Sequence, residues 1–146
     1  MVLYLKTPPK HAIFFTMILG VGIDLVSVRR IQELETQFKQ KFLQKVFTKN
    51  EILASQKKFS SEIFLAKRFA AKEAFSKALG LGLGRGINFS DIEIGNDDFG
   101  KPQIKILNNK EEFVKKHFHC EDFSVHLSLT DEESFASAVV LIEKKS

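Results

Sequence analysis

The sequence is poor in cysteine, proline and polar aromatic residues, and these shortages exclude several classes of protein. It has one cysteine, three prolines, one tyrosine and no tryptophan in 146 residues. A single cysteine excludes an internal disulfide, so the chain is not a disulfide-stabilised secreted scaffold. There is also no internal repeat, low-complexity segment or long linker. These features predict a protein that folds without disulfides in a reducing compartment, the cytoplasm.

The sequence also lacks a hydrophobic run long enough to cross a membrane. The apolar stretch 12–23 follows two lysines and superficially resembles a signal peptide, but no small-residue cleavage site follows it. A run of this length is too short to span a bilayer. We therefore expect a buried strand behind a flexible, dispensable leader, residues 1–16, with Met17 as a candidate natural start. Residues 17–146 are expected to form one domain.

The residues that are present suit a globular protein with an aromatic core. Hydrophobic residues make up 44% of the chain and charged residues 27%, and 15 of the aromatic residues are phenylalanine. A chain of this length can bury a sizeable core without a metal or a disulfide. The net charge of +4 is a mild bias. It favours an acidic partner or an anionic substrate only where the basic residues cluster.

Hydrophobic periodicity predicts a strand and three helices in the first half. Residues 18–24 form an apolar strand, and three- and four-residue spacing predicts one helix from Val28 to Val46. The sequence Thr48-Lys49-Asn50-Glu51 is a capping box, which predicts the start of a short helix. A longer helix is expected over 61–79, ended by Gly80.

The second half predicts mainly strands. A glycine-rich turn at 80–86 fits neither a P-loop nor a dinucleotide fingerprint. Two strands joined by a hairpin turn, a short helix and two further strands follow, at 91–94, 103–107, 109–118, 123–129 and 135–143. This order predicts an α+β fold, a small antiparallel sheet packed with one long helix and shorter helices.

Two acids and several cations suggest a site for phosphoryl transfer. Asp24 ends the first strand, and Glu73 and Lys77 share one face of the long helix because they are four residues apart. Alone, Glu73 and Lys77 favour a surface ion pair contributing about 0.2–0.5 kcal/mol. If Asp24 and Glu73 meet, however, two carboxylates suit Mg²⁺, which completes its shell with water and phosphates. Arg68, Lys72 and Lys77 then neutralise phosphate oxygens.

Two other patterns leave a ligand site and an ordinary surface equally open. In the strand 123–129 the polar residues alternate with apolar ones, and this polar strip comprises Ser124, His126, Ser128 and Thr130. It suits the hydroxyls or phosphates of a ligand, but also a half-solvated strand. The helix 28–46 carries Arg29, Arg30 and three lysines. This basic face is either solvated or suited to an acidic protein helix or a nucleic acid.

These residues, taken in order, resemble the holo-acyl-carrier-protein synthase family of 4′-phosphopantetheinyl transferases. The family has an apolar-Gly-apolar-Asp motif and a later Lys-Glu helix motif. Here Val21-Gly22-Ile23-Asp24 and the segment 69–77 match them, with 44 residues between Asp24 and Phe69. The resemblance extends over about residues 18–143. Asp131 departs from it, because some members have a second histidine there, and the leader has no expected counterpart.

The resemblance implies a reaction and its participants. 4′-Phosphopantetheine passes from coenzyme A to a serine of apo-acyl carrier protein, in cytoplasmic fatty acid biosynthesis, and adenosine 3′,5′-bisphosphate is released. Asp24 and Glu73 hold Mg²⁺ against the diphosphate, and Lys77 offsets the charge on the leaving group. The serine gives its proton to a metal-bound water or to Glu73, and the sequence leaves both open.

The resemblance also implies binding residues and an assembly. Arg29 and Arg30 meet the acidic carrier protein, and short members of the family form homotrimers whose sites lie at subunit contacts. The polar strip then completes a neighbour's site. The candidate coenzyme A contacts are Arg68, Lys72, Lys77, His126, Ser128 and Thr130.

Two other functions remain as alternatives to the transferase. One is a non-catalytic module that binds nucleic acid or an acidic protein through its basic helix, with steep salt dependence and no role for the acids. The other is a metal-dependent phosphohydrolase, which often needs more carboxylates than Asp24 and Glu73. We expect neither a nucleic acid nor a membrane as partner.

Overall fold

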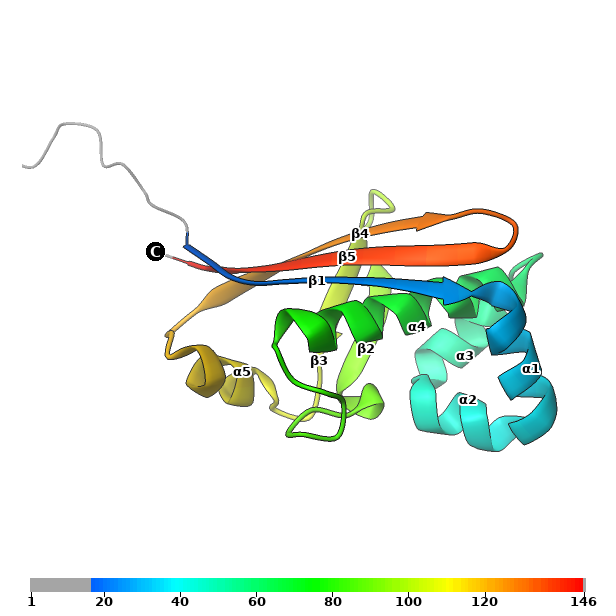
Figure 1. Ribbon diagram of the computed structural model, residues 1–146, viewed down its shortest axis with the longest axis horizontal. Coiled ribbons are helices and arrows are strands. Elements are labelled where there is room, and N and C mark those ends of the chain that lie inside the picture. The colour runs from blue at the N-terminus through cyan, green and yellow to red at the C-terminus, as the bar shows by residue number, and fades with distance from the viewer. Residues whose placement is uncertain (1–16, 146) are drawn as a thin grey trace, which may run out of the picture.

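A three-stranded antiparallel sheet and one long helix form the centre of the molecule (Figure 1). The computed structural model describes residues 17–145. The sheet has the order β1 (Met17–Ser27), β5 (Phe135–Lys144), β4 (Phe123–Asp131), and α4 (Ser61–Ala78) packs against one face of it. The expected α+β class and antiparallel sheet are confirmed.

Smaller elements surround this centre. The short helices α1 (Val28–Phe38), α2 (Gln40–Val46) and α3 (Lys49–Ser55) gather at one end of α4 (Figure 1). A separate hairpin is formed by two short strands, and a one-turn 3₁₀ helix and the last helix flank it. These elements are β2 (Ile92–Asn96), β3 (Pro102–Ile106), η1 (Phe89–Asp91) and α5 (Glu111–Phe118).

The predicted single helix from Val28 to Val46 was wrong, because the chain breaks at Lys39. Lys39 has a φ of 46°, which ends α1 and begins α2. The periodic pattern omitted Leu43, which is buried beside Val46, whereas Phe38 is half exposed. Breaking the helix turns α2 so that Leu43 enters the core, and the burial of one such side chain contributes about 1.5–3 kcal/mol.

The other helix boundaries follow the sequence signals closely. Thr48 and Glu51 form the predicted capping box, in which Glu51 Oε2 accepts the Thr48 N–H at 2.7 Å. Helix α4 ends at Ala78, and Gly80 follows with a φ of 70°, a conformation that glycine adopts without a Cβ penalty. The apolar side chains Ala71, Phe75 and Ala78 of α4 are buried, and Glu73 lies at the edge of the core.

Two glycines of β1 allow α4 to pack unusually close to the sheet. A Cβ atom on Gly20 would overlap the backbone carbonyl of Ala78, and one on Gly22 would overlap that of Ala74. Even a methyl group is therefore excluded from this contact. Because β1 carries Asp24 and α4 carries Glu73, the contact sets the separation of the two candidate acids.

The expected leader, residues 1–16, lies outside the described residues. Within residues 17–145, no helix is both long enough and apolar enough to cross a membrane.

Candidate active site

Asp24 and Lys77 join β1 to α4 directly. Asp24 lies on the face of the sheet that packs against α4, because it alternates with Gly22 along the strand. Its Oδ1 accepts a hydrogen bond from Lys77 Nζ at 2.8 Å, and the same ammonium donates to the Ile23 carbonyl at 3.0 Å. Within the described residues, the ion pair of Lys77 is thus with Asp24, and not with Glu73 as the spacing alone suggests.

Glu73 lies half-buried near Asp24. Burial raises the pKa of the Glu73 carboxyl above its usual value, and the negative charge of Asp24 raises it further. The positive charges of Lys77 and Arg30 oppose this rise. The structure therefore brings Asp24, Glu73 and Lys77 into one electrostatic unit. A cation placed between the two carboxylates would relieve their repulsion.

The donor set at this site suits Mg²⁺ better than a metal that needs an all-protein cage. Among residues 17–145, no group of three or more His, Cys, Asp or Glu side chains is arranged to hold a metal. Asp24 and Glu73 supply two carboxylates. Mg²⁺ is usually bound by one or two carboxylates together with water and substrate phosphates, so these residues fit that ion.

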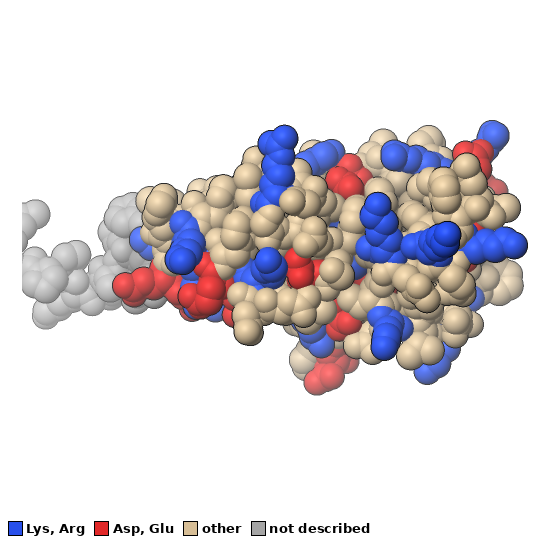
Figure 2. Space-filling model, turned by 90° about the horizontal axis from the view of Figure 1, so that it is seen from below, with Lys and Arg blue, Asp and Glu red and all other residues tan. Residues whose placement is uncertain are grey.

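Arg30 and Arg29 occupy different positions around the start of α1. The Arg30 N–H donates to Ser27 Oγ at 3.4 Å, which caps the helix, and the Arg30 side chain lies near enough to Glu73 to influence its pKa. Arg29 is highly exposed and pairs with Glu33 at 2.8 Å. Figure 2 shows basic side chains gathered over the end of the molecule formed by α1 to α3.

Lys72 lies in the core, and its side chain is fully buried. Its Nζ donates to Glu51 Oε2 at 2.7 Å, to the Val46 carbonyl at 2.7 Å and to the Phe89 carbonyl at 3.2 Å. Burial lowers the pKa of Lys72, and Glu51 partly offsets this effect. All three N–H donors of the ammonium are therefore used within the protein, and none faces solvent to receive a phosphate.

Arg68 lines a cavity near the start of α4. Its guanidinium lies over the Phe64 ring, 3.4 Å from Cζ to the ring centroid, and donates to Asn96 Oδ1 at 3.3 Å. Burial lowers the pKa of Arg68 to about 10, opposed by the charge of Glu51, so the side chain remains cationic at neutral pH. Its buried Nε has no hydrogen-bond partner within residues 17–145. A cation held this rigidly, with an unused donor, suits an anionic ligand.

This cavity, termed here the basic pocket, has a volume of about 590 Å³. It lies between α4, the loop before it, the β2–β3 turn and the end of β4. Among the residues that the structure describes, Asp131 is the one carboxylate that lines it, and its Oδ1 lies 2.7 Å from Lys67 Nζ. The charged and polar side chains that line it are Lys58, Ser60, Lys67, Arg68, Asn96 and Asp131.

The polar strip lies on the opposite face of the sheet from the acids. Ser128 pairs across the sheet with Val139, which in turn pairs with Ile23, so these three side chains share the face that α4 does not cover. His126 and Thr130 belong to the same face, and His126 Nε2 is 2.9 Å from Glu143 Oε1. Within one chain, the structure does not bring the polar strip to Asp24 and Glu73.

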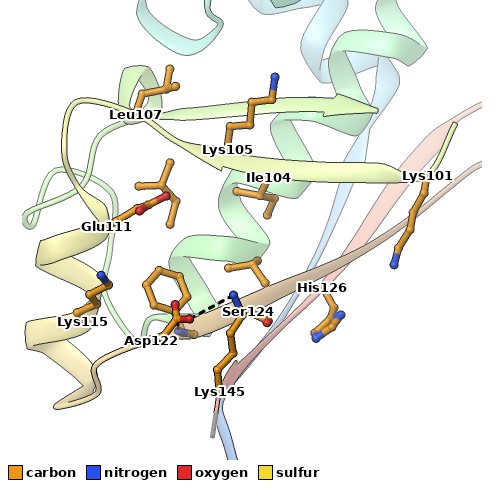
Figure 3. Close-up of a pocket in the computed structure, with 13 residues that line it drawn as sticks. Lys101, Ile104, Lys105, Leu107, Glu111, Lys115, Asp122, Ser124, His126 and Lys145 are labelled. Atoms are coloured by element: carbon orange, nitrogen blue, oxygen red, sulfur yellow. Dashed lines mark hydrogen bonds and ion pairs between the residues drawn. The ribbon is translucent and has the colours of Figure 1, made fainter. Parts of the chain in front are cut away.

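A second cleft, of about 720 Å³, lies between β3, α5 and β4 (Figure 3). Figure 3 shows Lys105 and Lys115 on opposite sides of it, and His126 and Ser124 on the β4 side. None of Asp24, Glu73 and Lys77 lines this cleft. Its position gives it no role beside the acids within one chain.

Sequence reasoning missed Lys58, Lys67 and Glu51. Lys67 directly precedes Arg68, but its approach to Asp131 depends on how α4 meets β4, which no local pattern records. Glu51 was recognised only as a helix cap. Its second role, as the partner of Lys72, had a weak signal in the sequence. Lys72 and Glu73 interrupt a run of alanine and phenylalanine residues, and a buried charge requires a partner.

Comparison with known proteins identifies the family of this chain. The 4′-phosphopantetheinyl transferase superfamily profile matches residues 20–140. The chain is 45% identical over 129 residues to a holo-acyl-carrier-protein synthase of Wolbachia pipientis subsp. Culex pipiens, covering 86% of this chain and 98% of the relative. It is 41% identical to that of Pelagibacter ubique, with 88% and 98% covered.

Solved structures show the same fold. The holo-acyl-carrier-protein synthase of Neisseria meningitidis superposes with a TM-score of 0.80 at 38% identity, covering 88% of this chain and all of that one. The Bacillus anthracis enzyme in complex with CoA (3′,5′-ADP) gives a TM-score of 0.72 at 37% identity, with 88% and 99% covered. The chain belongs to the 4′-phosphopantetheinyl transferase superfamily.

Proposed function

We propose that this protein is a magnesium-dependent holo-acyl-carrier-protein synthase. It transfers 4′-phosphopantetheine from coenzyme A to a serine of apo-acyl carrier protein, in the fatty acid biosynthesis of the cytoplasm. The observation that carries the proposal is the meeting of Asp24 and Glu73 beside Lys77, in a member of this superfamily. Relatives named for this activity, and a coenzyme A complex of one of them, support it.

Asp24 and Glu73 are the residues that would hold Mg²⁺. When bound, this ion neutralises phosphate oxygens and so stabilises the charge that develops during transfer. Asp24 is already paired with the Lys77 ammonium, so the chain balances this carboxylate before any ligand arrives. The Lys77 side chain is half exposed, so it would be free to turn toward a phosphate if a cation neutralised Asp24 in its place.

The reaction is a displacement at the β-phosphorus of coenzyme A. The carrier serine oxygen forms the new P–O bond, the bond to the bridging oxygen breaks, and adenosine 3′,5′-bisphosphate departs with that oxygen. The Glu73 carboxylate is the protein group of this site that can accept the serine proton. Lys77 offsets the negative charge on the leaving phosphate.

The basic pocket supplies a second anchor for coenzyme A. The diphosphate belongs beside Asp24 and Glu73, so the 3′-phosphate is the anion left for a separate cationic cavity. Arg68 is held there by Phe64 and Asn96, with Lys58 and Lys67 nearby. Lys72 acts differently from our sequence-based expectation: it supports the turn of α4 that carries Glu73.

A homotrimer explains how the polar strip reaches an active site. The uncovered face of the sheet exposes large apolar side chains of β1 and β5, among them Ile23 at 61% and Leu25 at 65% of their full exposure. An apolar face of this kind marks a protein–protein contact. A second copy packed on it would bring His126, Ser128 and Thr130 to a neighbour's coenzyme A. A fully active monomer in light scattering would refute this assembly.

The carrier protein approaches over the basic end formed by α1 and α2 (Figure 2). Arg29 and Arg30 are exposed there, and Arg30 lies beside Glu73, where the serine must arrive. An acidic carrier protein matches this charge. Such complementarity mainly raises the association rate and selects the partner.

One incubation tests the proposal. Purified protein is mixed with apo-acyl carrier protein, coenzyme A and Mg²⁺, and the mass of the carrier is followed by mass spectrometry. We expect an increase by one 4′-phosphopantetheine group, lost when coenzyme A or the divalent ion is withheld. If a competent carrier stays unmodified, the transferase function is rejected and a non-catalytic binding module is favoured.

A further inference from the structure

The basic pocket contains an internal anion. Asp131 ends β4, and its carboxylate pairs with Lys67 of α4, with Oδ1 and Nζ 2.7 Å apart. Both side chains are partly exposed, at 35% and 28%, and both line the pocket that holds Arg68. The carboxylate therefore occupies the position beside the Lys67 ammonium where a bound phosphate would be attracted most strongly.

We infer that Asp131 is an exchangeable counter-ion, which the 3′-phosphate of coenzyme A displaces from Lys67. Asp131 thereby sets how tightly the protein holds that phosphate. The inference rests on the proposed function and concerns a specificity-determining residue of the same site. It does not require the pocket to open, because the pair already borders solvent.

The chemistry of the pocket favours a phosphomonoester over the diphosphate. Within the described residues, the pocket has a single carboxylate, so it lacks the pair of acids that holds a metal against a diphosphate. It offers Lys58, Lys67 and Arg68 instead, and clustered lysine and arginine side chains suit a dianionic phosphate. A phosphate bound there meets one opposing charge, that of Asp131.

This arrangement acts on the product as well as on the substrate. Adenosine 3′,5′-bisphosphate keeps the 3′-phosphate, so a pocket without Asp131 would hold the product more tightly too. Asp131 can return to Lys67 as the phosphate leaves, which prevents the lysine from remaining unpaired. The expected consequence of this exchange is weaker substrate binding together with faster product release.

The central experiment measures the affinity of Asp131→Asn for two ligands by calorimetry. Coenzyme A should bind about three- to tenfold more tightly than to the wild type, as expected for removing one repulsive charge at a partly solvated site. The affinity for dephospho-coenzyme A, which lacks the 3′-phosphate, should change by less than about twofold. In kinetics, the KM for coenzyme A and the inhibition constant of adenosine 3′,5′-bisphosphate should fall by a similar factor.

Two further variants make the outcome decisive. Lys67→Gln should lower the affinity for coenzyme A by about three- to tenfold and leave the affinity for dephospho-coenzyme A unchanged. If Asp131→Asn does not fold, Lys67→Gln decides alone, and a loss that is equal for both ligands, or absent, overturns the inference. Glu112→Gln is the matched control, because it also removes a carboxylate from a lysine pair, with Lys115, away from the pocket.

The results separate this inference from the proposed function. Suppose that the wild type modifies the carrier, but Asp131→Asn either binds coenzyme A more weakly or binds coenzyme A and dephospho-coenzyme A more tightly by the same factor. The counter-ion role is then wrong, and the transferase function stands. If the wild type binds coenzyme A with the expected selectivity but modifies no competent carrier, the transferase is wrong and the pocket assignment stands.

Discussion

Lys72 forms a buried ion pair with Glu51, and it directly precedes Glu73 in the chain. Glu51 Oε2 accepts from Lys72 Nζ at 2.7 Å, while Glu51 Oε1 accepts from the Ile94 N–H at 2.9 Å. One carboxylate thus connects α3, α4 and β2. The pair holds the turn of α4 from which Glu73 projects, so it positions the site without touching a ligand.

Replacing Lys72 by methionine should strongly destabilise the fold. The substitution leaves the Glu51 carboxylate buried without its cation, a change that costs about 3–5 kcal/mol. Urea denaturation measures the free energy of unfolding. Lys115→Met is the control, because Lys115 pairs with Glu112 at the surface and its loss should cost far less stability than the loss of Lys72. Equal losses in the two variants would contradict the structural role of the buried pair.

Gly22→Ala should separate β1 from α4. The added Cβ would overlap the Ala74 carbonyl, a backbone atom that cannot turn aside, so we expect a loss of about 1–3 kcal/mol or more. Activity should fall further than stability alone explains, because Asp24 moves away from Glu73. Gly82→Ala is the matched control, with open space around its Cβ. Thermal unfolding and carrier labelling of both variants give the comparison.

Local patterns predicted the elements of this fold well. The Thr48 capping box, the end of α4 at Gly80 and the alternation of β4 all appear as expected, because each depends on residues close together in the chain. The break at Lys39 was missed. No glycine or proline marks this break. It accompanies the burial of Leu43 in the core, which depends on tertiary packing and not on the local sequence.

The candidate site was less predictable than the fold. The family resemblance implied that Asp24 and Glu73 share one site. The sequence did not predict the partner of Lys77, because the spacing suggested Glu73 on the same helix, whereas the structure pairs Lys77 with Asp24 on β1. Lys72 was predicted to be a coenzyme A contact, but the structure buries it. Its burial depends on Glu51, Val46 and Phe89, which are distant in sequence.

Asp24→Asn and Glu73→Gln should each lower activity by more than about tenfold. Each removes one of the two carboxylates suited to Mg²⁺, and a neutral amide binds that ion more weakly. The rate of carrier labelling at saturating coenzyme A and Mg²⁺ measures the effect. Asp122→Asn, which alters a surface pair with Lys145, should retain the wild-type rate. A near wild-type rate in either site variant would reject its metal role.

Glu73→Gln should also stabilise the protein at neutral pH. The pKa of Glu73 is raised in the folded state above its ordinary value of 4.5, so ionisation of this group opposes folding as the pH rises through the folded pKa. Glutamine carries no charge and avoids that cost. Thermal unfolding without metal should show a higher Tm for the variant at pH 7. The difference should vanish below pH 4.5, and its persistence there would point to another cause.

Ile23→Lys should disrupt the proposed homotrimer. Ile23 lies on the edge strand β1, on the uncovered face of the sheet and beside Val139, and a lysine there would place a charge in an apolar contact. Light scattering should report a monomer, and labelling activity should fall because the polar strip no longer reaches a neighbouring site.

The control for this disruption is Leu53→Lys, which alters an equally exposed leucine on α3, outside that face of the sheet. It should keep both the assembly and the activity of the wild type. Since both variants add one lysine to the surface, a general effect of charge or of lost apolar area would change them alike. Loss of assembly in Ile23→Lys alone identifies the sheet face as the contact, whereas an active monomer would show that each chain holds a complete site.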